Sequence, residues 1–145
     1  MKLIPVRRLI ENQRILFCED SIVRGTQLKD NIQVLYDYKA REAHMRPACP
    51  CLIFPCEFLN FSTSRSTLDL AGRQVIREIE GREDAHLDDY ARAGSDHNLE
   101  MIDRIRQRLK LTSLKYQALE DLIVAIGMPK EKLCTHCWDG SSYFK

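Results

Sequence analysis

Two adjacent carboxylates before a glycine-containing turn are the residues best suited to chemistry in this chain. Glu19 and Asp20 follow the apolar run Arg14-Ile-Leu-Phe-Cys18, and Ser21-Ile-Val-Arg-Gly-Thr26 leads from them into a segment with helical spacing. Backbone N–H groups of such a turn, its two hydroxyls and the helix dipole can hold a phosphate, and Gly25 permits close approach. The carboxylates can accept hydrogen bonds from neighbouring sugar hydroxyls. The run is a candidate phosphosugar site, and the alternative is an acidic pair that only caps the following helix.

The cysteines form the second candidate set, and they number six: Cys18, Cys49, Cys51, Cys56, Cys134 and Cys137. Clustered thiols in a cytosolic protein more often serve metals or redox chemistry than disulfides. Cys134-Thr-His-Cys137 has the spacing at which two thiolates reach one metal, and Cys56 could fold back onto it. A thioredoxin-like redox pair and two inert buried thiols are the alternatives. His44 and His136 are weaker candidate ligands.

The elements around the acidic pair are predicted to form a βαβ unit. The run Arg14 to Cys18 indicates a buried strand, expected to be parallel, with Cys18 in the core. Apolar residues recur at helical spacing from Thr26 to Ala40, where Thr26 can cap the helix. A second strand is predicted from Glu42 to Arg46, before prolines force an extended path through the middle cysteines.

The second half of the sequence is predicted to be mainly helical. One helical pattern runs from Ser66 to a break at Gly81, and two amphipathic helices run from Leu99 to Leu109 and from Leu119 to Ile126. Arg82 to Asn98 is a charged connector, either a loop or partly helical. The basic residues on the first amphipathic helix are interpreted as its solvated face rather than as a phosphate site: Arg104, Arg106, Arg108 and Lys110.

Length and charge narrow the classes of protein further. The chain has 145 residues, which suits one compact unit, and we divide it into residues 1–65, 66–133 and a tail at 134–145. Its formal charge of +1 gives no reason to expect a nucleic-acid partner. No apolar run approaches the length of a membrane helix, and the apolar stretch within residues 1–10 is too short for a signal peptide. We expect a soluble, cytoplasmic protein.

The literal run Glu-Asp-Ser-Ile-Val-Arg-Gly-Thr at residues 19–26 resembles the phosphoribosylpyrophosphate (PRPP) motif of amidophosphoribosyltransferases, usually Asp-Asp-Ser-Ile-Val-Arg-Gly-Thr. Other segments resemble the same family: Lys2-Leu-Ile-Pro-Val-Arg7, Arg46-Pro-Ala-Cys-Pro50, Phe54-Pro-Cys56, Ser113-Leu-Lys-Tyr116 and Ala125-Ile-Gly-Met-Pro-Lys-Glu-Lys-Leu-Cys134. The resemblance spans nearly the whole chain. It departs at Glu19, where Asp is usual, and at Leu59 and Phe61, which stand where Gly and Asp follow the Pro-Cys.

The resemblance implies an α/β fold: part of a type I phosphoribosyltransferase with a Rossmann-like parallel sheet, followed by a helical C-terminal region. It also implies transfer of ammonia to magnesium-bound PRPP, giving phosphoribosylamine for purine synthesis. Glu19 and Asp20 would contact the ribose hydroxyls and magnesium. The 5′-phosphate would be held by Ser21, Ile22, Val23, Arg24, Gly25 and Thr26. Such chemistry needs positioning and electrostatics rather than a covalent nucleophile.

The resemblance further favours a [4Fe-4S] cluster, as in the family's iron-sulfur branch, with zinc as the alternative metal. Cys56, Cys134 and Cys137 match three of its ligands, and Cys49 or Cys51 is our candidate for the fourth, whose family position lies upstream. A glutaminase half is expected upstream or in a partner chain, and the protein is expected to be a homo-oligomer. Two other functions stay open: a non-catalytic module that binds a phosphosugar or nucleotide, and a metal-stapled interaction fragment.

Overall fold

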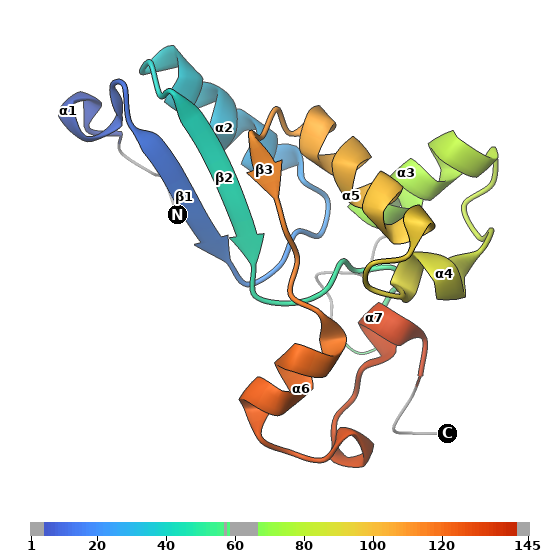
Figure 1. Ribbon diagram of the computed structural model, residues 1–145. Helices are drawn as coiled ribbons and strands as arrows, with labels where there is room; N and C mark the ends of the chain where they lie inside the picture. The colour runs from blue at the N-terminus through green and yellow to red at the C-terminus, as the bar shows by residue number, and fades with distance from the viewer. Residues whose placement is uncertain (1–4, 57, 59–66, 142–145) are drawn as a thin grey trace.

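A short parallel sheet forms the framework that carries the acidic pair (Figure 1). The structure is a computed structural model and describes residues 5–56, 58 and 67–141. Strands β1 (Arg14–Glu19), β2 (Glu42–Pro47) and β3 (Ser113–Leu114) lie in the order β1-β2-β3, and both pairs are parallel. Glu19 at the end of β1 pairs with Pro47 at the end of β2, so both strands end at the same edge of the sheet.

The helices alternate with the strands up to β2, and the chain is mainly helical after that strand. Their bounds are α1 (Arg7–Ile10), α2 (Thr26–Asp37), α3 (Ala71–Glu80), α4 (Leu87–Ala91), α5 (Asp96–Arg108), α6 (Leu119–Ile126) and α7 (His136–Asp139), with 3-10 turns at Thr67–Asp69 and Lys130–Lys132. Helix α2 connects β1 to β2 and completes the predicted βαβ unit. In Figure 1, α6 and α7 lie beyond the carboxyl ends of the strands.

The core is packed between the sheet and the helices α2, α3 and α5. Its most buried side chains alternate along β2 and repeat at helical spacing on the helices, and they include Ile32, Ala43, Met45, Val75, Ile76, Met101 and Ile105. Burial of this apolar surface is the main term that stabilises the fold. Apolar residues at helical spacing in the sequence thus supply core residues on α2 and α3, among them Ile32, Val75 and Ile76.

Strand β1 differs from its prediction as a buried strand. It is parallel to β2, but Leu16 is 60% exposed and Cys18 is also exposed, so Cys18 does not lie in the core. The reason is its position: β1 is the edge strand of the sheet among the described residues, and only one of its faces, with Ile15 and Phe17, packs against the core. An apolar run is equally compatible with either position.

Three helix boundaries also differ from the sequence-based expectations. Helix α2 ends at Asp37 rather than Ala40, and the helix expected from Ser66 begins only at Ala71, because Leu70 is extended. The connector contains the short helix α4, and α5 already begins at Asp96, where Ser95 caps it by accepting from the Asn98 N–H. The predicted ends at Gly81 and Gly127 are confirmed, since both glycines lie in the left-handed region just after a helix.

The apolar faces of the last two predicted helices are less buried than expected. Leu99 on α5 is 55% exposed, while Asn98, Met101 and Ile105 are the buried residues of that helix. Helix α6 has the predicted bounds, yet none of its residues is fully buried. Among the described residues, no helix has both the length and the apolar character needed to cross a membrane.

Candidate functional site

The phosphosugar loop, residues 19–26, begins where β1 ends and finishes in the first turn of α2. The Glu19 carbonyl accepts from the Ala48 N–H at 2.8 Å, and the Ser21 N–H donates to Asp20 Oδ1 at 2.6 Å. Both carboxylate side chains are exposed. The acidic pair therefore stands at the carboxyl edge of the sheet with oxygen atoms accessible to a ligand.

The turn of the loop depends on Gly25, which has φ +75 and is the N-terminal cap of α2. The Lys29 N–H donates to the Gly25 carbonyl at 3.0 Å and starts the helix. We predicted Thr26 as the cap, and this was wrong: Thr26 is the first helical residue, and no side chain caps the helix. First-turn N–H groups without a side-chain cap are suited to an anion, because the helix leaves them without internal partners.

Contacts from outside the loop fix its position. Ile22 is only 3% exposed and anchors the loop in the core. The Val23 carbonyl accepts from the Ala71 N–H at 2.8 Å, and the Arg24 guanidinium lies 3.2 Å from the Asp69 carboxylate. The 3-10 turn at Thr67–Asp69 and the start of α3 thus hold the second half of the loop in place.

The loop lines a cavity of about 790 Å³. All eight predicted residues, Glu19 to Thr26, contribute to it, and Leu28 and Asn31 on α2 complete its lining. Leu28 and Asn31 were missed in the sequence, although their spacing of three residues places them on one face of the predicted helix. The volume falls in the range of ligand-binding pockets. The described residues therefore bring the whole predicted phosphosugar site together.

The candidate metal residues form a second region, in which the C-terminal thiol segment (residues 134–140) packs against residues 49–56. The Cys137 carbonyl accepts from the Ile53 and Phe54 N–H groups at 3.0 and 3.1 Å. Burial, together with the neighbouring Cys56 and Cys134 thiols, raises the pKa of Cys137 to about 12. Cys56 and Cys137 are thus in contact, as the folding-back of Cys56 predicted.

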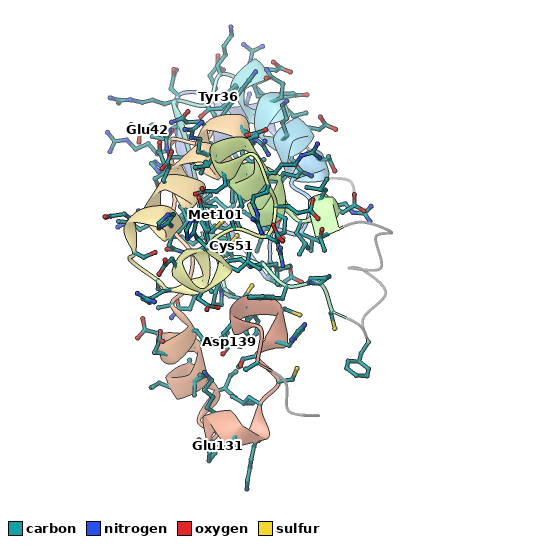
Figure 2. The ribbon with its side chains drawn as sticks, turned by 90° about the vertical axis from the view of Figure 1, so that its right-hand side faces the viewer. Tyr36, Glu42, Cys51, Met101, Glu131 and Asp139 are labelled. Carbon is teal, nitrogen blue, oxygen red and sulfur yellow. The ribbon has the colours of Figure 1, made fainter. Side chains whose placement is uncertain are left out.

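Cys49 and Cys51 are both buried, and each lies beside an aromatic side chain. Burial raises the pKa of Cys51 to about 12, and its thiol is close to the Tyr116 hydroxyl. Burial and the nearby Asp20 carboxylate raise the pKa of Cys49, and the Trp138 indole lowers it by a smaller amount. Among the described residues, Tyr116 Oη and Trp138 Nε1 find no well-aligned hydrogen-bond partner, so these are close contacts rather than good hydrogen bonds. Figure 2 shows Cys51 in the core, above the helix that carries Asp139.

This arrangement bears on the iron-sulfur and zinc predictions. Within the described part of the chain, no group of three or more His, Cys, Asp or Glu side chains is arranged to hold a metal ion. Cys134 is exposed, while Cys49 and Cys51 are buried beside Trp138 and Tyr116. His44 bonds to Ser113 and Glu42, and His136 lies against Phe54, so neither joins the thiols. The residues present do not form a four-ligand site in this conformation, and the metal stays a prediction.

Comparison with known proteins tests the resemblance. An amidophosphoribosyltransferase of Methanothermobacter thermautotrophicus is 31% identical over 140 residues, which cover 97% of this chain and 24% of that protein. The chain is a relative of the amidophosphoribosyltransferases. The Mycobacterium tuberculosis amidophosphoribosyltransferase is 28% identical over 141 residues, and that of Pyrococcus horikoshii is 46% identical over 56 residues. No family model matches the sequence.

The fold is shared with an amidophosphoribosyltransferase of known structure. A glutamine PRPP amidotransferase from B. subtilis, solved with ADP and GMP, matches with a TM-score of 0.64 over 94% of this chain and 25% of that one, at 23% identity. That likeness confirms the predicted α/β phosphoribosyltransferase-type fold. The chain spans about a quarter of the length of the amidophosphoribosyltransferases it matches. Leu59 and Phe61, which depart from the family pattern, lie outside the described residues.

Proposed function

We propose that this chain binds the 5-phosphoribosyl group of PRPP, with magnesium, as part of an amidophosphoribosyltransferase. The observation that carries the proposal is the cavity formed by the complete run Glu19 to Thr26. The sequence relationship to amidophosphoribosyltransferases supports the same ligand.

The two ends of the loop suit the two ends of this ligand. The uncapped start of α2 and the Ser21 and Thr26 hydroxyls suit a dianionic 5′-phosphate, because N–H donors and the helix dipole both favour negative charge. The exposed carboxylates of Glu19 and Asp20 suit the ribose hydroxyls. Their oxygen atoms are also the kind of ligand that Mg²⁺ takes. Magnesium would neutralise charge on the leaving pyrophosphate.

The reaction proposed for the complete enzyme is displacement at the ribose C1. The nitrogen of ammonia forms the new bond to C1, and the bond from C1 to the pyrophosphate oxygen breaks with its electron pair leaving on pyrophosphate. The attacking nitrogen then loses a proton to give phosphoribosylamine. Positive charge builds up at the ribose in this process, and the fixed carboxylates of Glu19 and Asp20 would stabilise it electrostatically. We assign no residue of this chain to pyrophosphate.

Calorimetric titration tests the proposal. We expect PRPP and ribose 5-phosphate both to bind in the presence of magnesium, because the loop contacts the part that they share. Pyrophosphate alone should bind at least about tenfold more weakly than PRPP, a difference of about 1.4 kcal/mol. Absence of heat with PRPP and ribose 5-phosphate would contradict the proposal. Ammonia-dependent pyrophosphate release would show turnover, and binding without release would favour the non-catalytic module.

A metal at Cys56, Cys134 and Cys137 is a separate proposal, supported by the contact between Cys56 and Cys137. It requires the exposed Cys134 thiol and a further ligand to complete the set. Iron and zinc analysis of protein purified without oxygen tests it. Stoichiometric metal that is lost in a Cys134→Ser variant but kept in Cys18→Ser supports the site, and metal-free protein argues against it.

A further inference from the structure

A second cavity lies behind the phosphosugar loop and shares part of its wall. It has a volume of about 300 Å³. Arg24, Gly25 and Thr26 line both this cavity and the phosphosugar cavity. The remaining lining comes from α2, α3 and α5, none of which contributes a carboxylate to it.

The floor of the second cavity is apolar. It includes Ala71 at the start of α3 and Ile105 and Leu109 at the end of α5, which are 7%, 2% and 5% exposed. Leu109 also supports the shared wall, since its Cδ2 atom lies 3.3 Å from the position of a β-carbon built on Gly25. An apolar floor favours a ligand with an apolar body over a simple inorganic ion.

The rim is basic. Arg24 pairs with Asp69 at 3.2 Å, and the Arg108 guanidinium bonds to Gln74 at 3.2 Å and to Glu78. Neither acid lines the cavity. Lys29, on the first turns of α2, has no ion pair or hydrogen bond to its ammonium group within the described residues. An unpaired ammonium beside two guanidinium groups attracts an anion.

We propose that this second cavity binds a small amphiphilic anion. Its apolar body would cover Ala71, Ile105 and Leu109, and its charged group would meet Lys29 and Arg108. The sequence alone placed Arg108 on a solvated helix face, and only the approach of α2 to α5 reveals this role. This site is distinct from the phosphosugar cavity and does not depend on the function proposed for it.

The shared wall couples the two cavities. A ligand that draws Arg24 away from Asp69, or that presses on Gly25 through Leu109, changes the position of the N–H groups on the phosphosugar side. By thermodynamic linkage the effect on binding is reciprocal, and typical couplings change affinity about fivefold or more. The second ligand would therefore change the affinity for ribose 5-phosphate, and ribose 5-phosphate would change the affinity for it equally.

Amide chemical-shift mapping on the full chain, with ribose 5-phosphate at saturating concentration, tests the site. The probes are naphthalenesulfonate, the neutral naphthalenemethanol and methanesulfonate, which lacks the apolar body. We expect naphthalenesulfonate to shift the amides of Lys29, Ile105 and Leu109 and to bind at least about tenfold tighter than either control. Equal affinity of naphthalenemethanol, or shifts elsewhere on the chain, would overturn the proposal.

Two charge-reversal variants distinguish binding in the second cavity from nonspecific electrostatic attraction to the protein surface. Lys29→Glu should weaken naphthalenesulfonate binding about tenfold, whereas Lys132→Glu, which makes the same change of charge at an exposed position lining neither cavity, should leave it unchanged. Equal losses of naphthalenesulfonate affinity in both variants would indicate nonspecific attraction and would contradict the proposal. If ribose 5-phosphate fails to bind but naphthalenesulfonate behaves as expected, the phosphosugar function fails and the second site stands.

Discussion

The phosphosugar loop and the C-terminal thiol segment are built in opposite ways. The loop is one continuous run of eight residues, and its cavity is lined by that run with two further residues from the next helix turns. The thiol segment is joined to residues 49–56 by contacts between distant parts of the chain, such as those of Cys137 with Ile53 and Phe54. A local site can be recognised from its sequence, whereas an assembled one depends on the rest of the fold.

The two regions are nevertheless neighbours. The Asp20 carboxylate of the loop helps to raise the pKa of Cys49, and Cys49 lies beside Trp138 of the thiol segment. Figure 1 shows α7 beyond the same strand ends from which the loop starts. Variants in each region can therefore test whether the two regions act independently.

The largest effect should come from the acidic pair. The double variant Glu19→Gln, Asp20→Asn should weaken magnesium-dependent binding of ribose 5-phosphate about 10- to 100-fold, because each amide can keep a hydrogen bond but loses the charge, which contributes about 1 kcal/mol per bond. Both side chains are exposed, so the fold should persist. Calorimetry measures the affinity, and Asp30→Asn, exposed on α2 but outside the cavity, is the control. A loss of equal size in that control would contradict the assignment.

Gly25 gives the next largest effect, and Gly81 is its matched control. The two have φ of +75 and +76, but a β-carbon on Gly25 would meet Leu109 at 3.3 Å, while one on Gly81 would meet nothing within 4 Å. Both changes to alanine should cost about 1 kcal/mol of unfolding free energy from left-handed strain.

Only Gly25→Ala should also weaken ribose 5-phosphate binding, about fivefold or more, because the new methyl group and the Leu109 side chain must move apart, and we expect the loop to take up part of that shift. Urea unfolding and calorimetry on both variants give the two quantities. Unchanged affinity in Gly25→Ala would show that the loop tolerates the shift and that its fixed shape does not determine binding.

Gly140 tests the thiol segment in the same manner. Gly140 and Gly127 both have φ +73, but only a β-carbon on Gly140 would press on the Phe54 ring, at 3.0 Å. Gly140→Ala should lower the unfolding free energy by about 1 kcal/mol more than Gly127→Ala, the usual cost of overpacking. It should also speed alkylation of Cys137. Ribose 5-phosphate affinity should stay within about twofold if the regions are independent, and a larger loss would show that they are coupled.

The smallest effect is a decline of stability at alkaline pH. The pKa values of Cys51 and Cys137 rise from 9.0 to about 12 in the folded chain, so the folded state keeps protons that the unfolded state releases. Their contribution is complete below pH 9 and falls as pH rises from 9 towards 12. Urea unfolding at several pH values should show a shallower decline in Cys51→Ala than in Cys18→Ser, whose thiol is exposed. Identical declines would contradict this origin.

The sequence predicted the loop, the βαβ unit and the core residues of α3, because each rests on local periodicity or on a contiguous motif. It missed what depends on neighbours. Cys18 was placed in the core because an apolar run does not reveal an edge strand. Thr26 was placed at the helix cap because threonine is a common capping residue, but the neighbouring Gly25 occupies that position. The two-residue strand β3 carries too short a pattern to be recognised, and the contact of Cys49 with Trp138 has no local signal at all.

The paired hydrogen bonds from Ile53 and Phe54 to the Cys137 carbonyl also have a consequence for the order of folding. They join residues separated by more than half of the chain, so closing this contact costs more entropy than forming the βαβ unit. The segment around Cys137 should therefore dock last, onto a core that is already formed. Until then its thiols are open to alkylation or oxidation. A pulse of alkylating reagent should therefore still label Cys137 at a stage of refolding when the core amides are already protected from hydrogen exchange.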